Sequence, residues 1–574
     1  MKKKIIFAFI FVCIILFAVF SIKNTFRNGY LEDLKNGDYI YINNTKYDVP
    51  PDLNGSEDIK IVSIENNTTT LKDISDKYTV EFPGIFEFDF SKSKDYIVAK
   101  NEDLYIHISK DRSPYEDTFW YIDYYQNRFY TNESFLQTNN ITLHENRQTE
   151  INGNKTTILT LTKHFDTLDD LTYTYAFIQT NGQYYTRFMF KSNNSFNDNY
   201  INMYTDVLNS YNETSESGIR ETLIYYANKI SKKLFNVEEL IASSKSQYFL
   251  DMHPIKNTNW DEKTLDLYNT FINSNDLKWG IFTENITTTA IDEKIPELEN
   301  TLNYKFDIIL MYNHLGNPLP IETMRKMKDK DKIIELTVQT CANNNTKLFD
   351  YTPMFDIIEG KRDEQIRILA NEIKEFGNPV LFRLNNEMNS DWTSYSGIIT
   401  LSDPEIYKEV WHKIYNIFEE ENVTNCIWIF NPNDNNYPPS KWNNFLAYYP
   451  GNEYVHMIGV TGYNTGTYYA EQNGETWKSF KTIYDEIYNK YKDLFKEFPW
   501  IITEFASSSV GGDKAKWIED MFKNINNYPN IKAAVWFSAA DYDPSYTETL
   551  KVSRPYWLDE TTEILEAFKK GLEN

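Results

Sequence analysis

The chain has 574 residues, a formal net charge of −25 at pH 7 and a sequence pI near 4.8. Binding to nucleic-acid phosphates needs clustered lysine and arginine, so this acidic balance excludes nucleic acid as a partner. The length exceeds what one hydrophobic core usually serves, and we expect two or more domains.

The N-terminus carries a membrane-targeting pattern. Lysine occupies positions 2–4, and an apolar run follows from Ile5 to Phe20, which Ser21 and Ile22 extend. Such a run is typical of a signal peptide and is also long enough to span a bilayer. Because no small-residue cleavage site follows, we expect residues 1–23 to be an uncleaved signal anchor, with the bulk of the chain outside the cell membrane. Secretion after cleavage is the alternative.

Cysteine is scarce beyond this segment. Cys341 and Cys426 both lie in predicted core strands, where a small buried thiol is expected rather than a disulfide. The sequence has no Cys/His cluster with the spacing of metal ligands, and we expect neither a metal nor another cofactor.

Residues 24–216 are predicted to form a β-rich α+β accessory domain. Short β-branched and aromatic runs alternate there with Asn, Asp and Gly turns, a pattern typical of an antiparallel sheet. Predicted strands include 78–82, 104–108, 119–124, 156–162, 173–178 and 184–190. A helix is predicted from Tyr200 to Tyr211, and the polar stretch 213–218 indicates a linker. We expect this domain to be a spacer or an interaction domain.

The pattern changes near residue 260 to a strand followed by a helix, repeated. Eight short apolar runs alternate with amphipathic stretches, at 278–283, 306–312, 333–340, 380–386, 426–431, 457–463, 500–504 and 533–538. Nearly continuous apolar strands alternating with helices indicate an α/β fold, a (β/α)8 TIM barrel, which we place at residues 217–574. A doubly wound open sheet would usually bring a glycine-rich phosphate loop, and we find none.

Two of the predicted strands have a glutamate at or directly after their C-terminal end. Glu387 follows the fourth strand and Glu504 ends the seventh. Reactive groups of such a barrel come from the C-terminal strand ends, and strands four and seven lie nearly opposite each other. Two carboxyl groups that meet there can cleave a glycosidic bond, one protonating the leaving oxygen while the other attacks or activates water. A single strand-end glutamate would more often only cap its strand, but two of them favour catalysis.

Aromatic residues gather in the loops expected on the same face. They are Trp392, Tyr395, Tyr437, Tyr468, Tyr469, Tyr542 and Tyr546. Exposed aromatic rings suit the apolar faces of pyranose sugars. Each ring alone is more simply explained by loop packing, whereas the group indicates a sugar-binding face.

In their order along the chain, these motifs resemble glycoside hydrolase family 26, a β-mannanase-type group of the (β/α)8 clan with catalytic glutamates on strands four and seven. The resembling segments are 383–389 with Trp392, then 428–433, 459–464, 502–505 and 535–537. The resemblance implies that Glu387 is the acid/base and Glu504 the nucleophile of a retaining enzyme.

The resemblance also implies roles for neighbouring residues. Tyr463 would hydrogen-bond the nucleophile, and Trp536 would form a platform under the sugar before the scissile bond. Arg383 would lie below the carboxylates and lower the pKa of its neighbour, with a purely structural ion pair as the alternative. Further substrate-binding candidates are Asn386, Trp392 and Asn431.

The sequence departs from the family pattern at three positions. Members usually have His directly before the acid/base and another His at the end of strand three, where this chain has Asn386 and Gln339. In many other families of the clan, an Asn in the place of Asn386 contacts the sugar 2-hydroxyl. Thr461 stands where an acidic residue is common. These changes leave the substrate open among β-mannan, glucan, xylan and a bacterial exopolysaccharide.

The leading hypothesis is therefore a membrane-anchored, extracytoplasmic retaining endo-β-glycosidase that hydrolyses a β-linked polysaccharide by double displacement. Its expected partners are the polysaccharide, the membrane through the N-terminal helix, and cell-envelope or polysaccharide-export proteins. One alternative is a non-catalytic polysaccharide-binding or envelope-assembly protein on a degenerate barrel, although both glutamates are present. The other alternative is a transglycosidase, which would share the same residues.

Overall fold

The computed structural model describes residues 39–42, 45–47, 59–214 and 250–573, apart from positions 74, 93, 341–350 and 547. The expected signal anchor, the predicted domain boundary at 216/217 and Cys341 lie outside the described residues. Within the described part, no helix is both long and apolar enough to cross a membrane. The chain divides into two compact units, one comprising Met1–Thr131 and Asn140–Leu250 and the other Asn132–Asn139 and Asp251–Asn574.

The N-terminal unit contains two antiparallel sheets. Their strand orders are β13-β5-β4-β3-β1-β2 and β6-β7-β8-β12-β11-β10-β9. The strands of the first sheet are β1 (Tyr39–Ile42), β2 (Thr45–Tyr47), β3 (Ile59–Glu65), β4 (Thr68–Asp73), β5 (Tyr78–Pro83) and β13 (Asn212–Glu213). Those of the second are β6 (Glu87–Asp89), β7 (Ile97–Lys100), β8 (Tyr105–Arg112), β9 (Ile141–Ile151), β10 (Asn154–Lys163), β11 (Leu171–Gln179) and β12 (Tyr184–Ser192). Helix α4 (Asp198–Ser210) packs into the core with both sheets, through residues such as Leu71, Ile106, Phe188 and Tyr204.

Two elements of this unit differ from the sequence-based expectation. The predicted strand 119–124 is helical: α2 (Thr118–Trp120) continues into the π-helix η1 (Tyr121–Gln126). Asp117 caps this helix, because its side chain accepts a hydrogen bond from the backbone N–H of Trp120 at 2.9 Å. Strand β9 was not predicted, because it is a mostly exposed edge strand whose polar sequence lacks hydrophobic alternation. A short helix, α3 (Glu133–Thr138), precedes β9 along the chain and belongs to the second unit.

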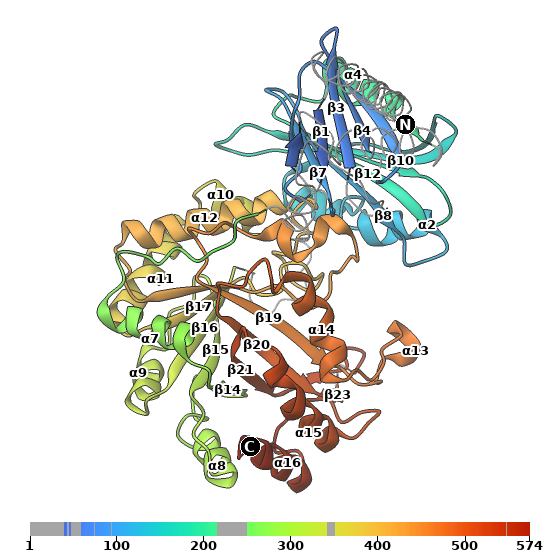
Figure 1. The fold of residues 1–574 in the computed structure, drawn as a ribbon. Coiled ribbons are helices and arrows are strands. Elements are labelled where there is room, and N and C mark those ends of the chain that lie inside the picture. The colour runs from blue at the N-terminus through green and yellow to red at the C-terminus, as the bar shows by residue number, and fades with distance from the viewer. Residues whose placement is uncertain are drawn as a thin grey trace, which may run out of the picture. The chain divides into compact units, whose positions relative to one another are not determined.

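In the second unit, eight parallel strands close into a barrel, which confirms the predicted (β/α)8 architecture. The strands are β14 (Lys278–Thr283), β15 (Ile308–His314), β16 (Ile333–Gln339), β17 (Val380–Leu384), β18 (Cys426–Phe430), β19 (Met457–Asn464), β20 (Trp500–Ser507) and β21 (Ile531–Ser538). Their apolar sequences follow from burial on both faces, by the barrel interior and by the helices around it (Figure 1).

The long helices of the barrel unit are amphipathic, and shorter helices lie among them along the chain. They are α7 (Glu262–Asn273), α8 (Lys294–Leu302), α9 (Ile321–Asp329), α10 (Met354–Ile358), α11 (Asp363–Phe376), α12 (Pro404–Glu420), α13 (Ala470–Asn473), α14 (Phe480–Tyr491), α15 (Lys514–Asn524) and α16 (Thr562–Leu572). Short 3-10 helices η3 (Lys441–Asn443), η4 (Phe445–Tyr448) and η5 (Ile525–Asn527), and a hairpin of β22 (Ala540–Tyr542) and β23 (Val552–Pro555), complete the unit. Cys426 is a buried free thiol, as predicted.

The lower interior of the barrel is a packed apolar core. It includes Leu310, Leu381, Ile429 and Val535 from the strands, together with Tyr268 from α7. Filling this interior leaves the polar strand ends at the opposite, C-terminal face, where such barrels carry their reactive groups.

Candidate active site

The turn after β17 places Glu387 through an unusual backbone conformation. Asn385 and Glu387 have φ of 48° and 58°, in the left-handed region that non-glycine residues other than Asn rarely adopt. The turn is held from both sides, because the N–H of Asn385 donates to the carbonyl of Val338 and the N–H of Glu387 donates to that of Asn431, at 2.9 and 2.8 Å. A strained residue fixed in this way is typical of functional sites.

A β-bulge in β20 places Glu504. The pairing of β20 with both neighbouring strands shifts register close to this residue. Thr503 consequently faces inward, with its hydroxyl 3.3 Å from that of Thr461, and Glu504 also turns inward. Phe505 points the other way and packs on Trp517. Bulges commonly re-aim a side chain next to an active site.

The Glu387 carboxyl is almost fully buried, at 6% exposure. Its Oε2 accepts hydrogen bonds from Trp392 Nε1 at 2.9 Å and from Asn433 Nδ2 at 2.8 Å. Burial, and next the negative charge of Glu504, raise the pKa of Glu387 to about 8, although both donors and Arg383 oppose the shift. The group is therefore a neutral acid near pH 7, and because both donors bind Oε2, its proton is left to Oε1.

Glu504 is surrounded by donors instead. Arg383 Nη2 lies 2.5 Å from its Oε1, and Asn386 Nδ2 donates to the same oxygen at 3.4 Å. The Tyr463 hydroxyl donates to Oε2 at 2.8 Å. The guanidinium and the two further donors pair both oxygens of this buried carboxyl group and fix its orientation.

The side chain of Arg383 lies entirely inside the barrel. Its Nε donates to Thr337 Oγ1 at 2.6 Å and its Nη1 to Asn431 Oδ1 at 3.0 Å. Burial alone would lower the pKa of the guanidinium, but Glu504 and its other neighbours raise that pKa above its ordinary value. Arg383 is therefore a fixed positive charge beneath the nucleophile candidate, as predicted for its position, and it does not reach the substrate side.

Asn386 is oriented by two buried donors. Gln339 Nε2 and the Tyr395 hydroxyl donate to its Oδ1 at 2.9 and 3.1 Å. Its oxygen is thereby occupied, and its Nδ2 is left to point at Glu504. Tyr395, one of the rings expected on the sugar-binding face, is completely buried and serves this network instead.

Besides Arg383, whose buried side chain does not reach the substrate side, the structure contradicts two of the predicted substrate contacts. Asn431 is fully buried, and its amide is bound to Arg383, Thr461 and the carbonyl of Pro432, so it supports the site from below. Trp536 is also fully buried and packs on Phe505 and Trp517, on the helix side of the barrel wall. Trp536 therefore cannot form the predicted sugar platform.

Strand alternation explains the error at Trp536. Val535 lies in the barrel core, so its neighbour must face outward and the next residue, Phe537, faces inward. The ring of Phe537 packs edge-on against Tyr463 and stacks on Phe282, with ring centroids 5.9 and 4.8 Å apart. Counting this alternation along the strand would have selected Phe537 from sequence.

The other predicted aromatic residues differ in exposure. Trp392 is 44% exposed, directly beside the carboxyl to which it donates. Tyr437, Tyr542 and Tyr546 are also exposed, while Tyr468 and Tyr469 are half-buried. Cations lie over three of these rings: Lys551 over Tyr468 and Tyr546, and Arg554 over Tyr469.

Sequence reasoning missed Asn433 as a site residue, although it quoted the segment that contains it. This residue comes three positions after β18, and its side chain is one of the two donors to Glu387. Asn389 holds it in place by accepting a hydrogen bond from its backbone N–H at 2.8 Å. The signal available in sequence was an Asn at the end of a barrel strand.

Comparison with known proteins relates a central segment of the chain to one family. The model of glycosyl hydrolase family 26 matches residues 267–496. Endoglucanase H of Acetivibrio thermocellus is 35% identical over 187 residues, which make up 32% of this chain and 20% of that protein. A mannan endo-1,4-beta-mannosidase of Bacillus subtilis is 33% identical over 125 residues, 19% of this chain and 32% of that protein.

The matched stretches thus span a fifth to a third of the length of these curated relatives. Among solved structures, a GH26 β-mannanase from Bacteroides ovatus aligns at 15% identity and a TM-score of 0.40, covering 55% of this chain and 93% of that one. Glu387 lies inside the range matched by the family model, and Glu504 follows just beyond it. The segment 267–496, which contains strands β14 to β19, belongs to glycosyl hydrolase family 26.

Proposed function

We propose that the chain is a retaining endo-β-glycosidase that hydrolyses a β-linked polysaccharide. The observation that carries this proposal is the contrast between two neighbouring carboxyl groups. Burial and a nearby negative charge favour the protonated form of Glu387, whereas Glu504 forms an ion pair with Arg383 and accepts hydrogen bonds from Tyr463 and Asn386. An acid beside an ion-paired carboxylate is the pair that glycoside hydrolysis requires.

In the first step of the proposed reaction, a Glu504 oxygen attacks the anomeric carbon while the Glu387 proton passes to the leaving glycosidic oxygen. The negative charge of Glu504 disappears when the ester forms, and Glu387 becomes a carboxylate. In the second step, Glu387 removes a proton from water, the water oxygen attacks the anomeric carbon, and Glu504 leaves. Each residue then returns to its initial protonation state.

For the substrate we propose a β-1,4-linked backbone of mannose or glucose. Both classes occur in the names of the curated relatives, an endoglucanase and a mannan endo-mannosidase. We propose that Asn386 contacts the sugar at the reacting centre through its Nδ2, because this atom points at Glu504 while the side-chain oxygen already accepts hydrogen bonds. The 2-hydroxyl is the group that distinguishes mannose from glucose at this place.

The test is reducing-sugar release by the chain lacking residues 1–24 from a panel of β-mannans, β-glucans, xylan and exopolysaccharide. Glu387→Gln and Glu504→Gln should each lower kcat by about a thousandfold or more, since each removes one chemical role. Glu284→Gln, an exposed glutamate directly after β14, is the matched control and should retain activity. Activity that survives either of the first two substitutions would refute the assignment.

Stereochemistry provides the second test. Proton NMR of the first products should show the β-anomer ahead of mutarotation, as double displacement requires. Initial release of the α-anomer would mean inversion, with Glu504 acting as a general base on water rather than as a nucleophile. A transglycosidase would instead give longer oligosaccharides from short ones in the same samples.

We further propose, from the sequence pattern alone, that residues 1–23 anchor the enzyme outside the cell membrane, with an accessory domain at 24–216 and the catalytic domain at 217–574. The full-length chain should sediment with membranes after a carbonate wash and should be degraded by protease added to intact cells stripped of their wall. Recovery of a soluble protein with a new N-terminus would favour secretion after cleavage instead.

A further inference from the structure

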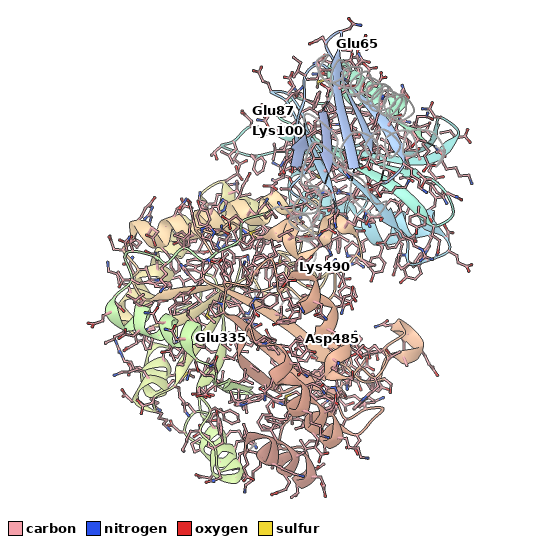
Figure 2. All side chains as sticks on the ribbon, viewed as in Figure 1. Glu65, Glu87, Lys100, Glu335, Asp485 and Lys490 are labelled. Atoms are coloured by element: carbon pink, nitrogen blue, oxygen red, sulfur yellow. The ribbon has the colours of Figure 1, made fainter. Side chains whose placement is uncertain are left out.

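A third glutamate lies inside the barrel. Glu335 belongs to β16 and pairs in register with Leu310 and Leu381, which are members of the apolar barrel core. Its side chain has no exposed surface. Figure 2 labels Glu335 among the strands of the barrel. Burying a carboxyl group in such a layer lowers the stability of the folded chain, so we expect Glu335 to have a partner or a functional role.

The partner of Glu335 is the guanidinium that also binds Glu504. Arg383 Nε lies 3.4 Å from Glu335 Oε1, while Arg383 Nη2 lies 2.5 Å from Glu504 Oε1. Among the residues that the structure describes, neither oxygen of Glu335 accepts a hydrogen bond. One cation is therefore bracketed by two carboxyl groups, one toward the core and one toward the reacting centre.

The charged and titratable side chains around Glu335 come from three strands. Arg383 faces it from β17, Glu504 lies beyond on β20, and the Tyr312 ring from β15 lies 5.5 Å from the guanidinium. Burial raises the pKa of Glu335 to about 8; Arg383 opposes this shift and Glu504 adds to it. At neutral pH the carboxyl of Glu335 is thus neutral, and the charge of Arg383 is balanced by Glu504 alone.

We propose that Glu335 is a positioning residue for the nucleophile: it holds the Arg383 guanidinium beneath Glu504 without competing for its charge. The inference rests on the proposed function, because Glu504 has this role only if the chain is a retaining glycosidase. A neutral carboxyl fills the space below the guanidinium, 3.4 Å from Nε, whose hydrogen goes to Thr337 Oγ1. An ionised one would draw the cation away from Glu504.

The first test compares two substitutions. Glu335→Leu removes the contact to Arg383 but suits the apolar layer, and Arg383 keeps its ion pair with Glu504, so no buried charge is left without a partner. We expect kcat to fall about tenfold and KM to stay within about twofold, because only the nucleophile is displaced. The thermal midpoint should not fall. Glu335→Gln, whose amide oxygen still faces Nε, should recover most of the lost kcat.

Leu310→Met is the matched control, since it alters the same layer without touching a charge. A structural residue without a catalytic task would give the reverse result for Glu335→Leu, namely a lower midpoint and an unchanged kcat. That result would overturn the proposal.

A crystal structure of Glu335→Leu gives a readout that does not depend on turnover. The Arg383 guanidinium is expected to move away from the Glu504 carboxylate by about an ångström or more, a displacement large enough to cost catalysis. If the wild type cleaves no polymer, the proposed function fails by itself, and this structure still decides the positioning role. An unmoved guanidinium would overturn that role whatever the activity.

Discussion

At the scale of single residues, the site separates two chemically identical side chains by what surrounds them. Glu387 has two neutral N–H donors on one oxygen and a negative neighbour, whereas Glu504 has a guanidinium on one oxygen and a phenol on the other. Burial beside a negative charge favours the acid form of Glu387, and the ion pair and the phenol fix the orientation of Glu504. In the proposed reaction, these surroundings assign the acid and the nucleophile before substrate binds.

The alkaline limit of activity should follow from the Glu387 proton. In the profile of kcat/KM against pH, which reports the free enzyme, activity should be lost as pH rises through about 8, because the acid form disappears. Trp392→Phe removes one of the donors that favour the ionised form, so the pKa of Glu387 should rise. The alkaline limb should then move to higher pH by about half a unit.

The matched control for this prediction is Tyr542→Phe, a polar-to-apolar change on an exposed ring with no hydrogen bond to Glu387. It should leave the position of the alkaline limb unchanged, whatever happens to KM. A limb that moves to lower pH in Trp392→Phe would mean that the indole favours the neutral acid, contrary to the geometry described above.

Residue patterns predicted which two carboxyl groups meet inside the barrel better than they predicted the residues around them. Glu387 and Glu504 do come together, because the negative charge of Glu504 acts on Glu387. Arg383 and Tyr463 contact Glu504 as the resemblance implied. The prediction for Trp536 was wrong because a motif shared with a family does not show on which side of a strand a residue lies.

At the scale of elements, the barrel strands were predictable and the irregular ones were not. Each barrel strand is an apolar run buried on both faces, so its position can be read from composition. The bulge beside Glu504 and the left-handed turn at Glu387 depend on hydrogen bonds between distant strands, which no local pattern records. The π-helix η1 was misread because its aromatic residues also favour strands.

Gly459 in β19 shows how closely the strands pack beneath the site. A Cβ atom at this position would lie 2.8 Å from Ile429 Cγ2, 2.9 Å from Thr503 Cγ2 and 3.0 Å from Asn431 Cβ. Gly459→Ala should therefore lower the free energy of unfolding by about 1–3 kcal/mol through overpacking. It should also lower kcat, because Asn431 holds Arg383 and Thr503 precedes Glu504.

Urea unfolding and kinetics on the folded protein would measure both effects. Asp261→Ala is the matched control, because Asp261 caps α7, away from the carboxylates, by accepting a hydrogen bond from the Thr264 N–H at 2.8 Å. Its loss should cost about 1 kcal/mol without a fall in kcat. Equal kcat values in the two variants would show that the barrel wall accommodates the methyl group without moving the site.

At the scale of the whole molecule, stability and catalysis oppose each other. Glu335 and Glu387 are buried carboxyl groups whose pKa is raised from 4.5 to about 8 in the folded chain. Between these two values the folded state holds protons that the unfolded state has released. A rise in pH through this window therefore favours unfolding, and the penalty is largest at and above pH 8.

The Glu335→Gln, Glu387→Gln double variant should remove that penalty, since an amide does not titrate. Its thermal midpoint should exceed that of the wild type by an amount that grows steadily from pH 5 to pH 8, as measured by calorimetry in buffers of equal ionic strength. Glu284→Gln, which removes an exposed carboxyl group instead, should run parallel to the wild type over the same range.

A constant difference between the double variant and the wild type would mean that both carboxyls are already ionised in the folded chain at pH 5. Since Glu387 must keep its proton to act as the acid, that outcome would also count against its proposed role. A difference that grows would instead identify the penalty with the carboxyl groups of the catalytic centre.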